Sequence, residues 1–252
     1  MDYRLTIDRG NTALKGAVWD NRGKLLIADS AVGFTSAGEL ARHLASGLLD
    51  KGEHFANAIY SSVVPSHRHE DIKTLKYLCP NLLELTRTTP LPIAIEYETP
   101  ETLGADRVAA AVGASSLYPK QNLLVADVGT AVTYDFLSEK GVFCGGNIAP
   151  GIHMRLEALH AFTDRLPQVE SLGPTPPWGL TTAQAMRSGA FRGIAAELEY
   201  YSRQAGNNAT AVLTGGSVPL LIRNGMLNIK YHHDPYLVHR GLHCIIHYNE
   251  NK

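Results

Sequence analysis

The stretch Leu123–Phe136, with the sequence LLVADVGTAVTYDF, is the part of the chain that decides the fold. Its first part is an apolar run that predicts a strand over Asn122–Ala126, and Ala131–Leu137 predicts a second strand. The residues between them, Asp127–Thr130, predict a tight turn. A carboxylate, a glycine and a hydroxyl in such a turn suit the binding of a phosphate or of its metal ion.

A similar pattern lies near residue 1. Tyr3–Ile7 predicts a short strand, Asp8–Thr12 a turn with the same residue types, and Ala13–Trp19 the returning strand. Turns of this kind also use Asp, Gly and Asn for purely geometric reasons, so one copy is weak evidence for a ligand. Two copies indicate two lobes that close on one ligand.

Two offsets support a true duplication. Asp127 follows Asp8 by 119 residues (127 − 8), and the hairpin glycine Gly141 follows Gly23 by 118 (141 − 23). In each copy a third strand follows the hairpin glycine, over Lys24–Ala28 and Val142–Ile148. Chance similarity of two short turns is the alternative, but the agreement of both offsets favours a repeated β-β-β unit.

Composition excludes several classes of protein. The 252 residues are 44% hydrophobic and 19% charged, which is typical of a soluble globular protein with one large domain or two lobes. The net charge is −1 and no Lys/Arg run occurs, so neither nucleic acid nor a membrane surface is an expected partner. We find no apolar run of transmembrane length and no signal-peptide pattern, and we expect a cytoplasmic protein.

The cysteines agree with that expectation. Cys79, Cys144 and Cys244 are odd in number and widely spaced, which fits neither a disulfide framework nor a zinc site. We interpret them as reduced, inert thiols.

The remaining elements alternate between strands and helices, which predicts an α/β protein. Helices are expected after the capping box at Ser36, over His69–Leu78 and Val108–Ser116, from Gly151 to about His160, from Thr182 as N-cap to about Leu198, after Ser217, and from Asp234–Pro235. Further strands are expected over Ala58–Val64, Leu82–Leu85, Thr210–Leu213 and Asn228–Tyr231. The segments 86–100 and 161–180 carry several prolines and are expected to be loops.

Common phosphate-binding motifs are missing from the sequence. It contains no G-x-x-x-x-G-K-[ST] and no G-x-G-x-x-G after a strand, so a P-loop enzyme and a classical dinucleotide fold lose their support. The segment Gly215–Pro219 is not a nucleophile elbow, because its last position is proline. The remaining candidates for phosphate binding are the two aspartate-glycine turns, together with Thr214–Gly216 at a later strand end.

As a set, the motifs closely resemble the type III pantothenate kinase family, of the acetate and sugar kinase, heat-shock chaperone and actin superfamily. They occur in the family's order and cover nearly the whole chain. The motifs are Ile7-Asp8-x-Gly10-Asn11-Thr12, Gly104-Ala105-Asp106-Arg107, Asp127-x-Gly129-Thr130-Ala131, Gly145-Gly146-x-Ile148-Ala149-Pro150-Gly151 and Thr214-Gly215-Gly216.

The resemblance implies a fold of two ribonuclease-H-like lobes, built from duplicated β-β-β-α-β-α units, with a nucleotide cleft between them. We place the lobes at residues 1–117 and 118–252. It also implies the ATP-dependent phosphorylation of pantothenate, the first step of coenzyme A biosynthesis, by a homodimer that uses ATP with Mg²⁺ and a monovalent cation, K⁺ or NH₄⁺.

The resemblance further implies roles for individual residues. Asp127 would face the monovalent cation. The expected ATP-binding residues are Asp8, Arg9, Gly10, Asn11, Thr12, Ala13, Leu14, Lys15, Thr130, Thr214, Gly215 and Gly216. The expected pantothenate-binding residues are Tyr97, Gly104, Ala105, Asp106, Arg107 and Thr182.

Physical reasoning points to Asp106 as the catalytic base. Phosphoryl transfer to a primary hydroxyl needs a carboxylate that accepts the hydroxyl proton. Asp106 follows an irregular proline-rich segment and lies at an expected helix start, which favours its ionised form. Arg107 could pair bidentately with a carboxylate or phosphate. Without the family resemblance, the two residues would more often form an exposed first-turn pair.

Some positions depart from the family pattern. Arg9 stands where the family usually has a small apolar residue, and we favour a solvent-facing side chain over one that reaches the phosphates. Val132 stands where Thr is frequent, and Thr181 where Asn is common. His239, His243 and His247 recur every four residues, and we favour solvated or interfacial histidines over a metal site.

Two other functions fit part of the pattern. One is a kinase of the same superfamily that acts on another small alcohol, such as a sugar. The other is a non-catalytic nucleotide-binding regulator, which would not need the base. Tyr97 with Gly104–Arg107 favours pantothenate over the first alternative, and retention of Asp8, Asp106 and Asp127 argues against the second.

Overall fold

The computed structural model describes residues 2–31, 34–50 and 53–251. The chain divides into two compact units: unit 1 contains Met1–Leu117 and Tyr236–Lys252, and unit 2 contains Tyr118–Pro235. The division expected from the sequence has the same boundary after residue 117, but it assigns 236–252 to the second lobe. The structure groups that segment with unit 1.

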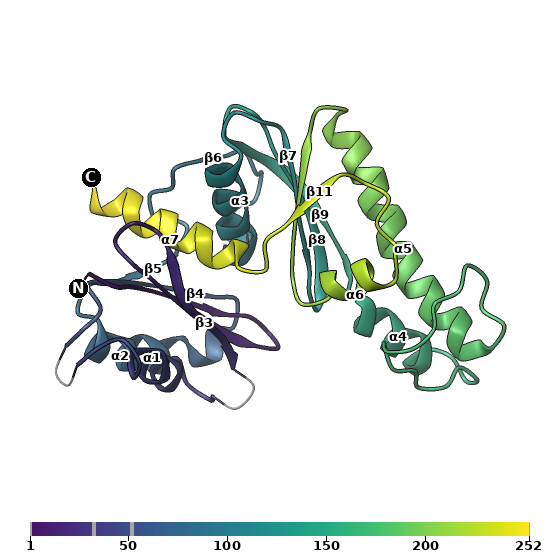
Figure 1. The fold of residues 1–252 in the computed structure, drawn as a ribbon, viewed down its shortest axis with the longest axis horizontal. Helices are drawn as coiled ribbons and strands as arrows, with labels where there is room; N and C mark the ends of the chain where they lie inside the picture. The colour runs from purple at the N-terminus through teal and green to yellow at the C-terminus, as the bar shows by residue number, and fades with distance from the viewer. Residues whose placement is uncertain (1, 32–33, 51–52, 252) are drawn as a thin grey trace. The chain divides into compact units, whose positions relative to one another are not determined.

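Unit 1 is a mixed sheet covered by helices on both faces. Its strands follow the order β3-β2-β1-β4-β5, with β1–β3 antiparallel and β4 and β5 parallel to β1. Helices α1 and α2 lie on one face, and α3 and α7 on the other (Figure 1). The elements are β1 (Arg4–Arg9), β2 (Leu14–Trp19), β3 (Leu25–Ala31), α1 (Ala37–Ala45), β4 (Asn57–Ser62), the 3₁₀ turns Pro65–His67 and Pro100–Thr102, α2 (Arg68–Leu78), β5 (Leu82–Glu84), β6 (Ala94–Ile95), α3 (Ala105–Leu117) and α7 (Leu237–Glu250).

Unit 2 repeats this topology. Its strands follow the order β9-β8-β7-β10-β11, again an antiparallel triplet followed by two parallel strands. The elements are β7 (Leu123–Val128), β8 (Ala131–Leu137), β9 (Val142–Pro150), α4 (Ile152–Ala161), α5 (Thr182–Ala205), β10 (Thr210–Thr214), α6 (Val218–Arg223) and β11 (Tyr231–His233). The two matching sheets confirm the predicted duplication and the two-lobed α/β fold.

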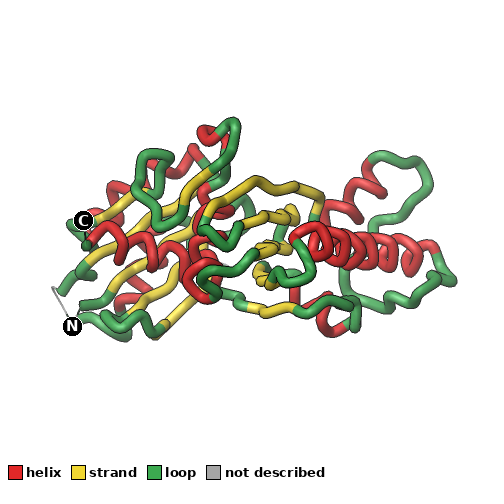
Figure 2. The backbone as a smooth tube through the Cα atoms, turned by 90° about the horizontal axis from the view of Figure 1, so that it is seen from above, coloured by secondary structure: helices red, strands yellow, loops and turns green. Residues whose placement is uncertain are grey.

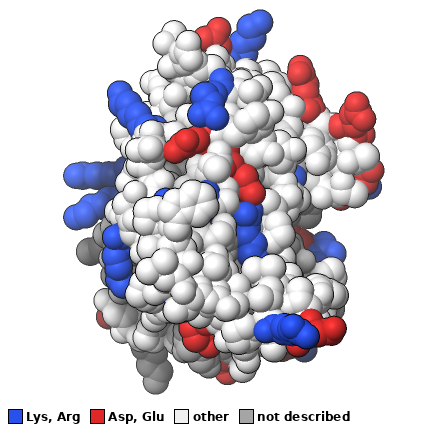
Figure 3. Space-filling view, turned by 90° about the vertical axis from the view of Figure 1, so that its right-hand side faces the viewer, with Lys and Arg blue, Asp and Glu red and all other residues white. Residues whose placement is uncertain are grey.

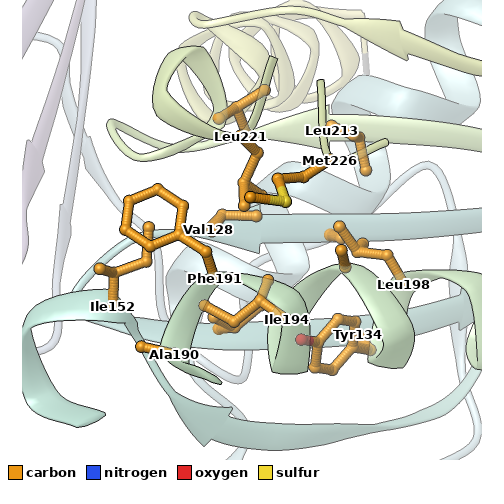
Figure 4. Packing of buried hydrophobic residues seen from close by; sticks show 14 of the residues in the cluster. Val128, Tyr134, Ile152, Ala190, Phe191, Ile194, Leu198, Leu213, Leu221 and Met226 are labelled. Carbon is orange, nitrogen blue, oxygen red and sulfur yellow. The ribbon is translucent and has the colours of Figure 1, made fainter. Parts of the chain in front are cut away.

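The alternation of apolar residues explains how each sheet acquires its core. In unit 1, Leu5 and Ile7 of β1 pack with Leu40 and Leu44 of α1, whose start is fixed by the predicted capping box at Ser36. In unit 2, apolar side chains of α5 pack against the sheet residues Val128 and Leu213 (Figure 4). Figure 4 labels Phe191, Ile194 and Leu198 on this helix.

Close helix packing explains why α7 belongs to unit 1. A methyl group added to Gly241 would overlap the carbonyl oxygen of Ala109, and one added to Gly113 would overlap that of Leu237. The two glycines therefore let α3 and α7 touch backbone to backbone. Arg4 and Glu250 add an ion pair of 2.8 Å between β1 and the end of α7. No local sequence pattern indicates these long-range contacts.

Several element boundaries differ from expectation, and those of β11, α7 and α5 have a clear physical reason. The strand expected over Asn228–Tyr231 is β11 at Tyr231–His233, and α7 begins at Leu237 instead of at Asp234–Pro235. The reason is that the Asp234 amide donates to the Leu213 carbonyl at 3.0 Å, which continues the pairing with β10. The helix α5 is capped by Thr181, whose side chain accepts from the Gln184 amide, so the expected N-cap Thr182 is wrong by one residue.

The segment between α4 and α5 is a loop, as predicted, and is drawn green in Figure 2. It exposes several large apolar side chains, including Phe162, Leu172, Trp178 and Leu180.

Candidate functional site

The turn after β1 presents a short polar loop on unit 1. The amide of Gly10 donates to the carbonyl of Ala13 at 3.0 Å and closes the turn. Asp8 is buried and lies opposite Lys15 on β2 and Ser61 on β4, while Asn11 and Thr12 are exposed. The turn therefore offers backbone amides, an amide side chain and a hydroxyl to a ligand, with a carboxylate behind them.

Arg9 does not face solvent, and that expectation is wrong. Its side chain is buried, and it forms an ion pair with Asp71, with 2.5 Å between Nε and Oδ2. A second bond joins Nη2 to Oδ1 at 3.0 Å. Because the guanidinium is engaged, only the backbone of Arg9 remains as a candidate phosphate ligand.

The turn after β7 has the same form in unit 2. The Gly129 amide donates to the Ala131 carbonyl at 3.0 Å, and Thr130 is exposed. The Gly151 amide donates to the Thr130 carbonyl at 3.0 Å, and a side chain on Gly151 would overlap the backbone of Gly129 and Thr130. The glycine-rich end of β9 thus supports this turn from behind.

The strand end of β10 lies directly against the same turn. Thr214 pairs with Asp127 across the parallel strands, and Gly215 has a φ of +100°. A methyl group on Gly215 would overlap Asp127 Oδ1 and the Val128 backbone. The structure thus brings together Asp127, Thr130 and the Thr214–Gly216 segment, which sequence reasoning assigned to one nucleotide.

The expected acceptor residues of unit 1 also meet. The guanidinium carbon of Arg107 lies 5.7 Å from the centre of the Tyr97 ring, and Arg107 is only 6% exposed. Asp106 is partly buried in the first turn of α3, where its Oδ1 accepts from the Arg107 amide at 2.8 Å. A side chain on Gly104 would overlap this carboxylate. The helix N-terminus stabilises the negative charge of Asp106.

Thr182, the sixth expected pantothenate residue, belongs to unit 2. It is the first residue of α5, in unit 2, and it is exposed. Five of the six expected pantothenate residues therefore belong to unit 1, and Thr182 belongs to unit 2.

The histidines of α7 have structural roles in unit 1. His239 is 4% exposed, with its Nδ1 at 3.0 Å from Thr6 Oγ1, and His243 stacks on Trp19 with 5.0 Å between ring centres. Burial lowers the pKa of His239 to about 3 and that of His243 to about 4, so both are neutral at pH 7. Of the solvated or interfacial histidines that we expected, His239 is not solvated but buried within unit 1, and His247 is exposed. Residues 2–31, 34–50 and 53–251 contain no group of three or more His, Cys, Asp or Glu that could hold a metal ion.

Sequence reasoning missed Asp71. This residue lies in the first turn of α2 and is almost fully buried, yet the sequence shows only an acidic residue near a helix start. Ordinary first-turn residues of this kind are exposed and favour the helix dipole, so nothing in the local pattern distinguishes Asp71.

Figure 3 shows Lys and Arg side chains interspersed with Asp and Glu on the face that it presents. Of the helices in the described part of the chain, none has both the length and the apolar character needed to cross a membrane. The cysteines are unpaired, with Cys79 buried and Cys144 exposed.

Comparison with known proteins gives a consistent result. Residues 4–204 match the family model described as type III pantothenate kinase. A type III pantothenate kinase of Porphyromonas gingivalis is 39% identical over 259 residues, which covers 99% of this chain and 100% of the relative. One of Phocaeicola vulgatus is 37% identical over 249 residues, covering 98% of both chains.

Solved structures share the fold. A structure from Campylobacter jejuni, described as a Baf family transcriptional activator, has a TM-score of 0.63 at 22% identity and covers 98% of this chain and 100% of its own. A glucokinase from an Antarctic psychrotroph has a TM-score of 0.53 at 13% identity, with 98% and 99% covered. These likenesses show the two-lobed kinase fold.

Proposed function

The chain belongs to the type III pantothenate kinase family, and from that membership we propose which of its residues carry out the reaction. The activity is the ATP-dependent phosphorylation of pantothenate, the first step of coenzyme A biosynthesis. The observation that carries the assignment of residues is the pair of matching strand-turn-strand units, each with an aspartate, a glycine and a hydroxyl at its strand end.

We propose that both turns bind ATP. The loop Asp8–Lys15 offers backbone amides and the exposed Asn11 and Thr12 to the phosphates, and Lys15 adds a positive charge. In unit 2, Thr130 contacts the nucleotide, and Thr214–Gly216 lies against the adenosine. The absence of a side chain at Gly215 and Gly216 lets the backbone approach the ligand closely.

The cations of the reaction are assigned on the chemistry of the donors. ATP is used with a divalent metal ion, as for kinases of this family. We propose that Asp127 also faces a monovalent cation, K⁺ or NH₄⁺. The donor fits this role, because a carboxylate is a ligand for hard cations and Asp127 is a partly buried carboxylate at the end of β7. When bound, such a cation supplies positive charge near the nucleotide phosphates.

Pantothenate is held by Tyr97, Gly104–Arg107 and Thr182 in this proposal. Arg107 is held against Tyr97 and is suited to the carboxylate of the substrate. Asp106 accepts the proton of the primary hydroxyl as the phosphoryl group is transferred to the hydroxyl oxygen. Asp106 lies in the first turn of α3, with its Oδ1 2.8 Å from the Arg107 amide.

We further propose a cytoplasmic homodimer. The apolar side chains exposed on α4 and on the loop after it support a subunit contact, since Phe162 and Trp178 are each 86% exposed. Thr182 follows this loop directly, so a second copy seated there would lie near a residue assigned to pantothenate. Sedimentation of the purified protein tests the dimer, and the double variant Phe162→Ser/Trp178→Ser is expected to sediment as a monomer.

One assay tests the residue assignment as a whole. The purified protein is incubated with pantothenate, ATP and Mg²⁺, with either K⁺ or Na⁺, and phosphopantothenate is measured by mass. We expect product that depends on K⁺. Folded protein that gives no product under any cation would sink the proposal. Product from a sugar in place of pantothenate would favour the alternative of another small-alcohol kinase.

A further inference from the structure

We propose that Asp71 is a positioning residue for ATP, which acts by holding Arg9 and thereby fixing the loop Asp8–Lys15. This inference rests on the proposed role of that loop in phosphate binding. Arg9 is the last residue of β1 and is followed directly by Gly10, whose amide closes the turn. The conformation of Arg9 therefore sets the direction in which the chain enters the loop.

The bond between the two residues has the geometry of a rigid pair. Two parallel hydrogen bonds join the guanidinium and the carboxylate, at 2.5 and 3.0 Å. The Arg9 Nη2 donates a further bond to the Thr35 carbonyl at 3.3 Å. Both side chains are buried, and bidentate pairs of this kind restrict orientation as well as distance.

Asp71 is itself fixed from two other sides. The amide of Ala37, at the start of α1, donates to Oδ1 at 2.9 Å, and the Tyr60 hydroxyl of β4 donates to Oδ2 at 2.8 Å. Burial raises the pKa of Tyr60 to about 12, so this hydroxyl keeps its proton and remains a donor. One carboxylate thus connects β1 with α1 and β4, and these elements form a rigid frame behind the loop.

Backbone pairing also holds the strand end, because Arg9 pairs with Leu14 of β2 and Ser62 of β4, and the Val63 amide donates to the Arg9 carbonyl at 3.1 Å. The tip of the loop is more open to water. Gly10 has no side chain, and Asn11 and Thr12 are exposed. Leu14 and Arg9 are the buried side chains that flank the turn. An apolar residue at position 9 would keep the backbone pairing and fill the same space, but its side chain could not be oriented by directed bonds to Asp71. A buried ion pair is a costly way to obtain stability, which favours an additional role in orientation.

The chain contains a matched control at the opposite end of β1. Arg4 is the first residue of the strand and also pairs bidentately with a carboxylate, that of Glu250 on α7. This pair shares the strand and the type of contact, but it lies at the end of β1 away from the phosphate loop. A loss of general stability should follow from disrupting either pair, whereas a loss of ATP binding should follow only from disrupting the pair of Arg9.

The test compares Asp71→Asn and Arg9→Lys with Glu250→Gln. Affinity for a non-hydrolysable ATP analogue is measured by calorimetry without pantothenate, and KM is measured for both substrates. For Asp71→Asn and Arg9→Lys we expect the ATP-analogue Kd and the KM for ATP to rise about 10-fold or more, with KM for pantothenate changed less than about 2-fold. For Glu250→Gln we expect a lower melting temperature with both KM values unchanged.

The results for these variants either support or overturn the positioning role of Asp71. A folded Asp71→Asn protein with unchanged affinity for the ATP analogue would overturn the proposal, as would equal rises in both KM values. If Asp71→Asn does not fold, Arg9→Lys decides, because it keeps the charge and loses only the bidentate geometry. Failure of the wild-type protein to bind the analogue would instead contradict the role of the loop itself.

Discussion

Gly215 lies directly against the carboxylate of Asp127, so closely that a methyl group on its α-carbon would overlap Asp127 Oδ1. The two residues are 88 positions apart in the chain and meet because β10 pairs with β7. The backbone of Gly215 also has a φ of +100°, which favours glycine. The contact between the two strand ends therefore depends on the absence of one side chain.

Replacement of Gly215 by Ala is expected to destabilise unit 2. The added methyl group must displace Asp127 or the Val128 backbone, and the positive φ adds strain, so we expect a loss of about 2 kcal/mol or more in the free energy of unfolding. Urea denaturation measures this loss. The control is Gly216→Ala, whose added methyl group meets nothing within 4 Å, and its unfolding free energy should change by less than about 0.5 kcal/mol.

The proposed cation role of Asp127 predicts a loss of K⁺ dependence. Asp127→Asn removes the negative charge with little change in shape, so turnover in K⁺ should fall to the level seen in Na⁺. Initial rates in the two salts, at equal ionic strength, measure the effect. Glu139→Gln, in the exposed hairpin turn of the same unit, should keep the wild-type ratio of the two rates. A normal K⁺ response in Asp127→Asn would remove this residue from the cation site.

Replacement of Asp106 by Asn tests the catalytic base. Turnover should fall by about two to four orders of magnitude, the usual contribution of a general base, because the amide cannot accept the hydroxyl proton. Binding of the ATP analogue should persist. The exposed Glu101, five residues earlier, provides the control Glu101→Gln with unchanged turnover. Near-normal turnover in Asp106→Asn would show that another group accepts the proton.

The contact between α3 and α7 predicts opposite effects for two helical glycines. Gly241→Ala should lower the free energy of unfolding by about 3 kcal/mol, since its methyl group would overlap the Ala109 carbonyl and force the helices apart. Gly189→Ala, on the exposed side of α5 with open space around it, should raise it by up to about 1 kcal/mol through higher helix propensity. Thermal and urea unfolding of the two variants would distinguish them, and equal effects would contradict the close contact.

The buried histidines predict a loss of stability in mild acid. The folded-state pKa values of His239 and His243, about 3 and about 4, lie below the ordinary value of 6.5. Between these limits the unfolded chain binds protons that the folded chain does not, so stability is full above pH 7 and falls as the pH falls. From pH 7 to pH 5 the loss should be about 2 kcal/mol for His239 and less for His243. Urea titrations at both pH values measure it, and His239→Gln should reduce the slope.

Local patterns in the sequence were sufficient for much of the fold. The apolar runs beside Asp8 and Asp127 predicted the strands of both hairpins, because alternation and turn residues act over only a few positions. The offsets of the two turns and their hairpin glycines, which agree to within one residue, predicted the duplicated sheet. The capping box at Ser36 predicted the start of α1. The helix start expected at Asp234–Pro235 was wrong because the Asp234 amide donates to the distant Leu213 carbonyl. The cap expected at Thr182 was wrong by one residue within a local pattern, in which Thr181 accepts from the Gln184 amide.

Some features of the candidate site could be identified from the sequence, and others needed the tertiary structure. Its residue types and order, from Asp8 through Asp106 to Gly215, could be identified from the sequence as a family pattern. The state of Arg9 could not, because its partner Asp71 is 62 residues away and resembles an ordinary first-turn carboxylate. The burial of His239 depends likewise on Thr6, at the other end of the chain.

By itself, the sequence determined two repeated strand-turn-strand units, the α/β class, and the chemistry of a kinase that acts on a small alcohol. The repeated units and the α/β class follow from short-range periodicity and turn residues. The kinase chemistry follows from the resemblance of the motif set to one family. Only the tertiary structure decided that α7 packs on α3, that Gly215 touches Asp127, and that Arg9 is held by Asp71. Such contacts depend on steric fit and burial between distant segments, which no local window of sequence contains.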